Sequence, residues 1–336
     1  MRISRKQLLL WGWIIIACGV LRGVFFLQHI NAPLILAEPY TADVSAGTTF
    51  NRLVTRLANA GIIDNPFDVR LYARLSGRAN NIKAGEYALM PGMTSRDLLD
   101  KLVAGDVIVH QVVLLEGWTL YQALAAIQDH PMITASLDPS DPEALQTALG
   151  SPVYPEGMIF PDTYNFSRGV TDHELLRRAY QKMAEVLAEE WPGRDVGLPY
   201  DDEYDALIMA SIIEKETALA SERQQIAGVF VRRLQQGMRL QTDPTVIYGM
   251  GENFSGDLTR ADLRRQSPYN TYLNVGLPPT PIALPGRESI HASLHPDQGD
   301  TLYFVARGDG SHQFSSSLEE HERAVQQFQL GRQQDQ

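Results

Sequence analysis

Two glutamates lie two residues apart at the end of an apolar segment, where carboxyl groups can act as proton donors. The segment covers residues 206–213, and Glu214 and Glu216 follow it. A helix over about 203–218 would be apolar nearly all the way round and therefore buried. A carboxyl at its C-terminal end would be desolvated and close to the negative end of the helix dipole, and both effects raise its pKa. Such a group suits general acid catalysis near neutral pH.

The spacing does not choose between the two glutamates. On a helix they diverge by about 200°, so they cannot act as a facing pair. Glu216 continues the row of Ile208 and Ile212, whereas Glu214 lies on another row. Two glutamates that only cap a core helix are the structural alternative.

Two downstream segments, 240–249 and 267–272, combine tyrosines with amide and hydroxyl side chains. A sugar presents ring faces for stacking and hydroxyls for hydrogen bonds, so these segments suit a glycan ligand. A rigid, proline-rich loop that only supports the fold is the alternative for any single residue.

Other chemistries have weak support. His291 and His295 are spaced i, i+4, but no glutamate lies between them, so this is not a metalloprotease helix. We interpret these histidines, with His312 and His321, as structural. The sequence has no phosphate-binding or dinucleotide-binding glycine motif. A net charge of -11 argues against a nucleic-acid partner. No metal and no cofactor are predicted.

The N-terminus predicts a membrane anchor. Basic residues precede an apolar run over 8–27, which Arg22 alone interrupts. Twenty helical residues span roughly 30 Å, the thickness of a bilayer core, and Arg22 is close enough to the exit to extend its charge to the surface. The basic flank predicts a cytoplasmic N-terminus. A cleavable signal peptide lacks a clear A-x-A site, and a lipid-modified Cys18 conflicts with the apolar residues after it.

The organisation predicts an α+β fold in four parts: a cytoplasmic tip and transmembrane anchor (1–30), a linker (31–43), a small α+β module (44–150) and a helix-rich domain with short strands (151–330). In the module, a glycine turn and a threonine cap precede a helix three times, at 46–49, 91–94 and 116–119. Strands are expected near 85–89 and 109–114.

Helix boundaries in the two domains are predicted from capping pairs and one glycine stop. The capping pairs are Thr94 with Asp97, Thr119 with Gln122, Thr171 with Glu174, and Ser221 with Gln224, and the stop is Gly237. The last third should contain short strands, such as 301–305, and a polar helix.

Several long strings resemble one family. MASIIEKETALASER, RLQTDPTVIYGMGE, YNTYLNVGLPP, LPGRESI and LYFVARGDGSHQF are similar to the MltG (YceG-like) endolytic murein transglycosylases, and the likeness covers nearly all of 156–325. The N-terminal module resembles that family's LysM-like region in the strings KAGEYALMPGMT and LLEGWTL. Thr280-Pro281 departs from the pattern, since relatives carry a glycine and a small residue there.

The resemblance implies site residues. The second glutamate of the EKET string is catalytic in that family, which maps onto Glu216 and leaves Glu214 a supporting role. The QTDPT and YNTY segments line the family's cleft. The implied substrate-binding residues are Gln241, Thr242, Asp243, Thr245, Tyr269, Asn270 and Tyr272.

The resemblance also implies the activity. The family cleaves the β-1,4 bond between N-acetylmuramic acid and N-acetylglucosamine without water and leaves a 1,6-anhydro end. The implied partners are peptidoglycan glycan strands, the inner membrane and peptidoglycan synthases, with the catalytic domain in the periplasm cutting nascent strands. A hydrolytic muramidase and a non-catalytic wall-binding scaffold are the alternatives.

Overall fold

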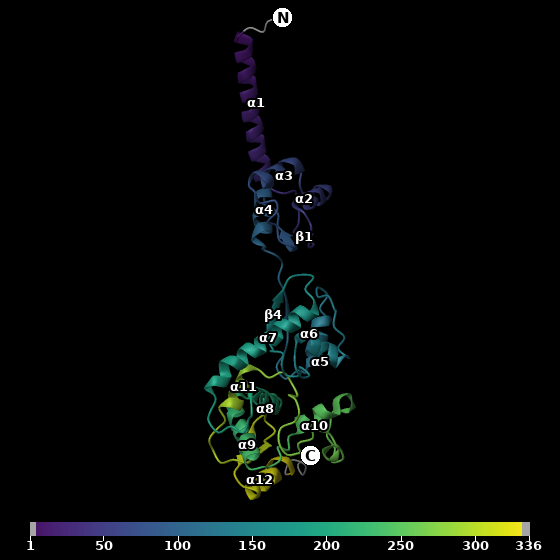
Figure 1. The fold of residues 1–336 in the computed structure, drawn as a ribbon, viewed down its shortest axis with the longest axis vertical. Coiled ribbons are helices and arrows are strands. Elements are labelled where there is room, and N and C mark those ends of the chain that lie inside the picture. The colour runs from purple at the N-terminus through teal and green to yellow at the C-terminus, as the bar shows by residue number, and fades with distance from the viewer. Residues whose placement is uncertain (1–4, 331–336) are drawn as a thin grey trace. The chain divides into compact units, whose positions relative to one another are not determined.

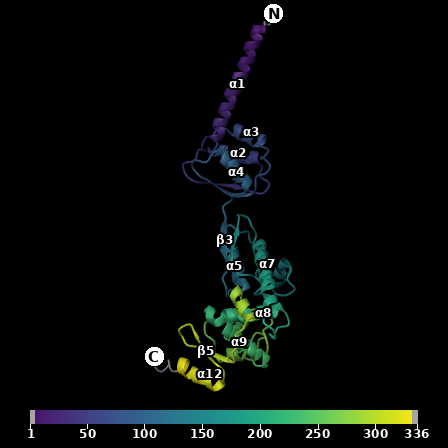
Figure 2. The ribbon, with the colours of Figure 1, turned by 90° about the vertical axis from the view of Figure 1, so that its left-hand side faces the viewer.

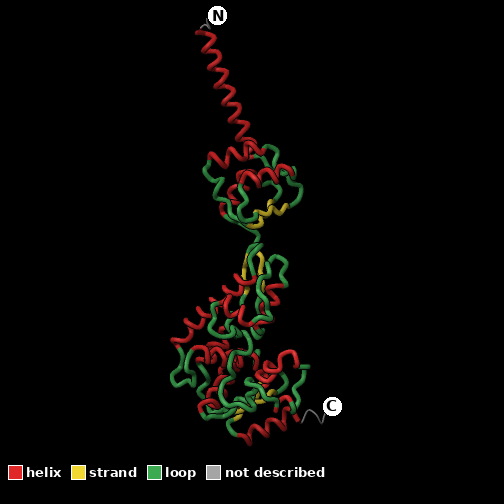
Figure 3. Tube along the Cα trace, turned by 45° about the vertical axis from the view of Figure 1, so that its right-hand side comes forward, coloured by secondary structure: helices red, strands yellow, loops and turns green. Residues whose placement is uncertain are grey.

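The computed structural model describes residues 5–330 and shows an α+β protein with many helices and short strands (Figure 3). The chain forms two compact units. The N-terminal unit comprises the residues up to His110 together with Asn165–Gly169, and the C-terminal unit comprises the remainder. The predicted α+β class is confirmed.

In the N-terminal unit, a long helix precedes a small sheet and three shorter helices (Figure 1). The two strands pair antiparallel, from Tyr40 opposite Leu89 to Val44 opposite Gly85. The predicted strand over 85–89 is therefore confirmed. The elements are α1 Arg5–Asn31, β1 Tyr40–Val44, α2 Phe50–Asn59, α3 Pro66–Leu75, β2 Gly85–Leu89 and α4 Ser95–Ala104.

The predicted glycine–threonine–helix pattern is present in this unit. The Thr94 hydroxyl accepts a hydrogen bond from the backbone N–H of Asp97, and the Asp97 carboxylate accepts one from the N–H of Thr94, so the capping box is complete. The Thr49 hydroxyl caps α2 by accepting a hydrogen bond from the N–H of Arg52. Gly47 precedes it with a φ of 77°, which favours glycine. The apolar faces of these helices form the core of the unit, with Leu53, Leu57, Leu98, Leu99 and Leu102 fully buried.

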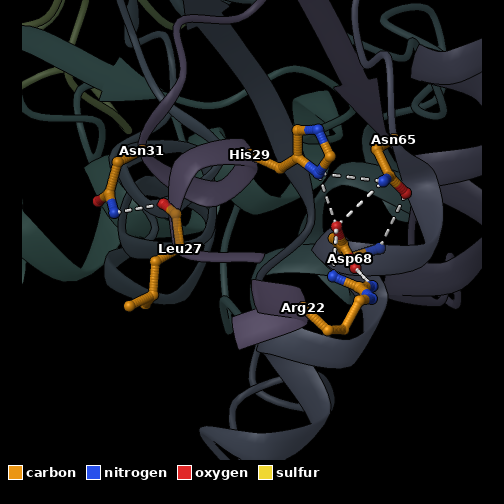
Figure 4. Close-up of polar contacts among 6 residues, drawn as sticks. All are labelled: Arg22, Leu27, His29, Asn31, Asn65 and Asp68. Atoms are coloured by element: carbon orange, nitrogen blue, oxygen red, sulfur yellow. Dashed lines mark hydrogen bonds and ion pairs between the residues drawn. The ribbon is translucent and has the colours of Figure 1, made fainter. Parts of the chain in front are cut away.

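Helix α1 is longer than the predicted apolar run. Its segment Leu9–Asn31 is the one helix in the described range 5–330 that is long and apolar enough to cross a membrane. Arg22 was expected to reach the membrane surface. Its guanidinium donates hydrogen bonds to the carboxylate of Asp68 in α3, as Figure 4 shows.

Asp68 joins α1 to α3. Its side chain has no exposed surface, and besides Arg22 it contacts Nδ1 of His29 at 2.8 Å and Nδ2 of Asn65 at 3.0 Å (Figure 4). Burial alone would raise the pKa of Asp68, but the hydrogen bonds and positive charges of Arg22 and His29 outweigh burial and lower it. The carboxylate is thus a charged, fully partnered link between the two helices.

The C-terminal unit is built around one buried helix, α8, which packs against α9, α10 and α11 (Figures 1 and 2). Strands β3 His110–Val113 and β4 Thr163–Phe166 come before α7 in the chain, and their residues are divided between the two units. The sheet of β5 with β6 follows α11 and belongs to the C-terminal unit. The elements are α5 Leu120–Gln128, α6 Pro142–Leu149, α7 Asp172–Glu190, α8 Glu203–Glu216, α9 Arg223–Gln235, α10 Asp243–Met250, α11 Arg287–Leu294, β5 Tyr303–Ala306, β6 His312–Ser315 and α12 Leu318–Val325.

The compact units divide the chain at 110/111, whereas the sequence predicted a module that ends at 150. The difference arises from contacts between residues that are distant in sequence. The N–H of Leu120, at the start of α5, donates to the carboxylate of Glu156 at 2.8 Å. The backbone of Trp118 accepts a hydrogen bond from Leu284 at 2.7 Å. The third glycine–threonine–helix segment therefore belongs to the C-terminal unit.

The other boundary predictions have mixed outcomes. The capping boxes at Thr119 and Thr171 are complete, and Gly237 has the positive φ, 67°, expected after a helix. The predicted capping pair of Ser221 with Gln224 is wrong. Ser221 lies in a 3-10 turn, η2 Ala220–Glu222, and α9 begins at Arg223 without a side-chain cap.

The link between α1 and α3 is testable. We expect Arg22→Ala to destabilise the protein by about 2 kcal/mol, because it leaves a buried carboxylate short of its main cation. In an Asp68→Asn background the same change should have a much smaller effect. Thermal unfolding of the full chain in detergent micelles measures both. Equal effects in the two backgrounds would show that Arg22 stabilises the protein by another route.

Candidate active site

Helix α8 carries Glu216 to the edge of the core. The Asp202 carboxylate caps the helix by accepting hydrogen bonds from the N–H groups of Tyr204 and Asp205. Every residue from 206 to 213 is buried, as the sequence predicted. The helix ends at Glu216, two residues earlier than expected, because Thr217 is extended with φ −144° and ψ 137°. The glutamate therefore lies where the buried helix meets solvent.

The carboxyl of Glu216 is poorly solvated. Burial raises its pKa to about 7, and the negative charge of Asp243 acts in the same direction. A hydrogen bond from the Thr242 hydroxyl and the charge of His312 oppose this rise without cancelling it. The predicted rise is confirmed, and the carboxyl can therefore be protonated near neutral pH.

Glu214 lies in different surroundings. One of its oxygens accepts a hydrogen bond from the N–H of Gly286 at 2.9 Å, and the other lies 4.0 Å from the guanidinium of Arg223. Its side chain is only 7% exposed. Gly286 precedes the first residue of α11, so Glu214 interacts with the positive end of that helix. This geometry fits the supporting role that the resemblance implies.

The loop before α10 positions Thr242 against Glu216. Thr242 is the N-cap residue of α10, yet its hydroxyl does not cap that helix and bonds Glu216 instead. Its backbone is held from the other side, because its N–H donates to the Thr271 hydroxyl at 3.1 Å and its carbonyl accepts from the Thr245 hydroxyl at 2.8 Å. Gln241 has a φ of 55°, which is unfavourable for a residue with a side chain and often marks a functional site.

A hollow of about 490 Å³ lies in front of Glu216. The Tyr272 hydroxyl in this hollow donates to Asp243 at 2.6 Å. The side chains form an acidic and aromatic wall beside the glutamate. Of the residues predicted from the sequence, those that line it are Glu216, Gln241, Thr242, Asp243 and Tyr272.

The other three predicted residues do not line this hollow. Thr245 and Asn270 have no exposed surface. The amide of Asn270 donates to the backbone carbonyls of Leu263 and Arg265, so it holds its loop in place. The Tyr269 hydroxyl is 2.9 Å from that of Thr280, the position that departs from the family pattern. These contacts fit support of the site, not direct substrate binding.

Sequence reasoning did not assign several residues of the hollow to the site, among them His312, which it interpreted as structural. His312, on β6, lines it and is held by Glu222, whose carboxylate contacts His312 Nδ1 at 2.7 Å and accepts from its N–H at 2.9 Å. Arg233 also lines it and donates to the carbonyls of Leu240 and Leu302. No local pattern identifies these residues, because β6 reaches α8 only through the tertiary fold.

A second hollow of about 520 Å³ also reaches Glu216. The ammonium group of Lys215 donates to the Gly117 carbonyl there at 3.0 Å. Its remaining lining includes Glu116, Trp118, Glu214 and Arg223. Glu216 therefore lines two hollows, and a ligand with parts in both would pass its carboxyl.

Glu156 is a useful comparison, because its pKa is also raised by burial to about 7. Its side chain is enclosed, with one oxygen bonded to the N–H of Leu120 and the other to the hydroxyl of Tyr248. The residue is only 2% exposed. Glu216 combines a raised pKa with access from a hollow, which makes it the better candidate for proton transfer.

Three of the four histidines discussed from the sequence, His291, His295 and His312, have acidic partners. His291 contacts Glu190 at 3.0 Å, and His295 contacts Asp195 at 3.0 Å. Within the described residues, no group of three or more His, Cys, Asp or Glu side chains is arranged to hold a metal ion.

The raised pKa of Glu216 predicts a pH-dependent effect on stability. A carboxyl with a raised pKa in the folded state favours folding at low pH, and this contribution is lost as pH rises from about 4.5 through 7. Glu216→Gln removes that loss. We expect the unfolding free energy of the variant, relative to wild type, to increase by about 3 kcal/mol between pH 4.5 and pH 8. Thermal unfolding across this range measures it, and a constant difference would contradict a desolvated Glu216.

Comparison with known proteins identifies the family to which the chain is similar. Residues 42–327 match the model of the YceG-like family. A Bacillus subtilis protein named endolytic murein transglycosylase is 33% identical, over 85% of this chain and 84% of its own length. A Streptococcus pneumoniae protein of the same name is 29% identical over 90% of this chain, which spans 62% of that relative's length.

A solved structure agrees with this assignment. The crystal structure of a yceG-like protein from Listeria monocytogenes has a TM-score of 0.53 and 31% sequence identity, and the match covers 85% of this chain and 99% of that one. Together with the match over 42–327, this shows that the chain is a member of the YceG-like family.

Proposed function

We propose that this protein is a membrane-anchored endolytic murein transglycosylase that cleaves peptidoglycan strands with Glu216 as its acid and base. The observation that carries the proposal is the Glu216 carboxyl, which has a pKa of about 7 and lines two hollows. Family membership and the names of the relatives support the substrate class.

The proposed reaction uses one carboxyl twice. Protonated Glu216 donates its proton to the oxygen of the β-1,4 bond between N-acetylmuramic acid and N-acetylglucosamine as that bond breaks. The resulting carboxylate then takes the proton from the muramoyl 6-hydroxyl, whose oxygen bonds to the anomeric carbon and closes a 1,6-anhydro ring. No water enters, and the proton count on Glu216 is restored.

A single carboxyl is sufficient because the nucleophile is already part of the substrate, which supplies proximity. A pKa near 7 suits both steps, since the group must give up and regain a proton at similar cost. Thr242 stabilises the carboxylate form by its hydrogen bond, and burial stabilises the protonated form. These opposing effects keep the two forms close in free energy.

The wall of the hollow provides substrate contacts in this proposal. Tyr272 offers a ring face for a sugar, and Gln241 and Asp243 offer hydrogen-bonding groups. Thr245, Tyr269 and Asn270 act by holding the loops that carry these groups.

Hydrolysis is the second candidate, because Asp243 lines the same hollow as Glu216. Glycosidases pair an acid with a second carboxylate that activates water or attacks the sugar. Asp243 accepts a hydrogen bond from Tyr272 at 2.6 Å, which orients it. The products separate the two reactions, since an anhydro end is lighter than a hydrolysed end by one water.

The proposed membrane anchor determines in which compartment the reaction occurs. We propose that α1 crosses the inner membrane with its N-terminus in the cytoplasm and that the C-terminal unit is periplasmic, because basic residues flank the apolar segment on its N-terminal side. There the enzyme would meet nascent strands and work beside peptidoglycan synthases. In the N-terminal unit we propose a LysM-like module.

A non-catalytic scaffold that binds the cell wall is the remaining alternative. Such a protein would bind sacculi and release no fragments.

The first test is Glu216→Gln with purified peptidoglycan strands. Loss of the transferable proton should reduce cleavage by about 10²- to 10⁴-fold while strand binding persists. Mass spectrometry of the wild-type products should show anhydro ends. Glu252→Gln, the same change at an exposed position in the C-terminal unit, should retain full activity. Unimpaired cleavage by Glu216→Gln would remove this residue from the mechanism, and only hydrolysed ends would establish a muramidase.

The second test uses the charge next to Glu216. Because Asp243 raises the pKa of Glu216, Asp243→Asn should lower it. The protonated form is then lost at lower pH, so the alkaline limb of the rate profile should move to lower pH by roughly half a unit. Asp257→Asn, at an exposed position, is the matched control and should leave the limb in place. A shift to higher pH would contradict the assigned electrostatics.

A further inference from the structure

The contact between Arg22 and Asp68 fixes where α1 meets the folded part of the N-terminal unit. Arg22 and His29 both reach Asp68 on α3 (Figure 4). Asp68 is fully buried, so the helix is already part of the folded unit at position 22. The segment from Leu9 to Leu21 is what remains to cross the membrane freely.

This free segment is short for a bilayer. Leu9 to Leu21 spans about 20 Å at a helical rise of 1.5 Å, whereas a hydrocarbon core is about 30 Å thick. Helix α1 continues with exposed apolar residues beyond Arg22, including Val24, Phe25 and Leu27. A span of this length places the end of the folded unit that holds α3 at the membrane surface or within the interfacial region.

Helix α3 has an outward face suited to that position. In Figures 1 and 2 it is the element of this unit that lies nearest the free part of α1. Asp68, Val69 and Ala73 are buried on its inner side. Phe67 and Leu75, eight residues apart on the outer side, are 65% and 72% exposed. Exposed apolar residues of this size at helical spacing are typical of a contact surface.

Basic side chains accompany this apolar face. Phe67, Leu71, Arg70 and Arg74 line a hollow of about 500 Å³. One guanidinium nitrogen of Arg70 donates to Thr55 at 2.7 Å, but its Nε is buried and has no hydrogen-bond partner among the described residues. Arg74 is exposed. An anionic group in this hollow would meet two guanidinium groups.

We propose that the outer face of α3 is a membrane-contact surface, in which Phe67, Leu71 and Leu75 enter the lipid interface and Arg70 and Arg74 bind the phosphate of an anionic phospholipid. A bilayer fits both halves of this surface, because it presents acyl chains beside phosphate groups. Because α3 lies next to the part of α1 that is proposed to cross the membrane, we favour a bilayer over a protein as the partner of this surface. The inference rests on the membrane anchoring proposed above, and it adds that the N-terminal unit lies against the membrane and is not free on a tether.

A depth probe on the full chain tests this surface. Cys18→Ser removes the only cysteine, and Leu75→Cys then carries a fluorescent NBD label. The matched control is Thr41→Cys, an exposed position on β1, which lies at the opposite end of the same unit from α1 (Figures 1 and 3). Both proteins are reconstituted in vesicles of phosphatidylcholine with phosphatidylglycerol that carry brominated acyl chains.

We expect bromine quenching and a blue-shifted emission at position 75, and neither at position 41. Emission typical of water at position 75, in chain that floats with the vesicles, would overturn the inference and leave the anchor proposal intact. A blue shift without bromine quenching would identify a protein contact and would also overturn it. Failure of the chain to float with vesicles would refute the anchor and the inference together.

The arginines are tested by lipid preference. Quenching at position 75 by brominated phosphatidylglycerol, relative to brominated phosphatidylcholine, reports enrichment of the anionic lipid. Arg74→Gln should reduce this ratio about fivefold, the effect of one surface arginine. Arg52→Gln, an exposed arginine on α2, is the control and should leave it unchanged. An equal ratio in wild type and Arg74→Gln would contradict phosphate binding.

Discussion

The C-terminal unit depends on one constraint, the emergence of a buried apolar helix at a carboxyl that stays poorly solvated. Residues 206–213 of α8 are enclosed by neighbouring helices, so the end of the helix cannot move toward water without disrupting the core. Desolvation therefore raises the pKa of Glu216 to about 7. The loop before α10 is arranged around this group, since Gln241 adopts an unfavourable φ and the Thr242 hydroxyl bonds Glu216 instead of capping its own helix.

Much of the fold follows from local signals in the sequence. The capping boxes at Thr94, Thr119 and Thr171 form as predicted, because both partners lie within one turn and need no tertiary help. The pair at Ser221 fails because the chain tightens into a 3-10 turn there. The extent of the compact units was also not predictable, since it depends on contacts such as that of Leu120 with Glu156, 36 residues away.

The candidate site also has features that local sequence signals predict and features that they do not. The position of a carboxyl at the end of a buried helix, and its raised pKa, follow from the pattern of α8 alone, whereas the choice of Glu216 over Glu214 came from family resemblance. Resemblance also found the two loops, but it could not separate residues that line the hollow, such as Tyr272, from fully buried supports, such as Asn270. That distinction depends on side-chain direction within irregular loops, where no period of two or 3.6 residues applies.

Two buried carboxyls in this chain show how partners decide what such a group does. Asp68 is enclosed completely, yet two basic side chains reach it, its pKa falls, and it serves as a fixed charge that joins α1 to α3. Glu216 has a hydroxyl as its hydrogen-bond donor and a negative neighbour, so burial prevails and its pKa rises. A paired carboxylate cannot readily take up a proton, and this suits a structural link. Where burial outweighs the contacts that stabilise the charge, as at Glu216, a carboxyl exchanges its proton near neutral pH. Because a hollow opens beside Glu216, that proton can be passed to a ligand.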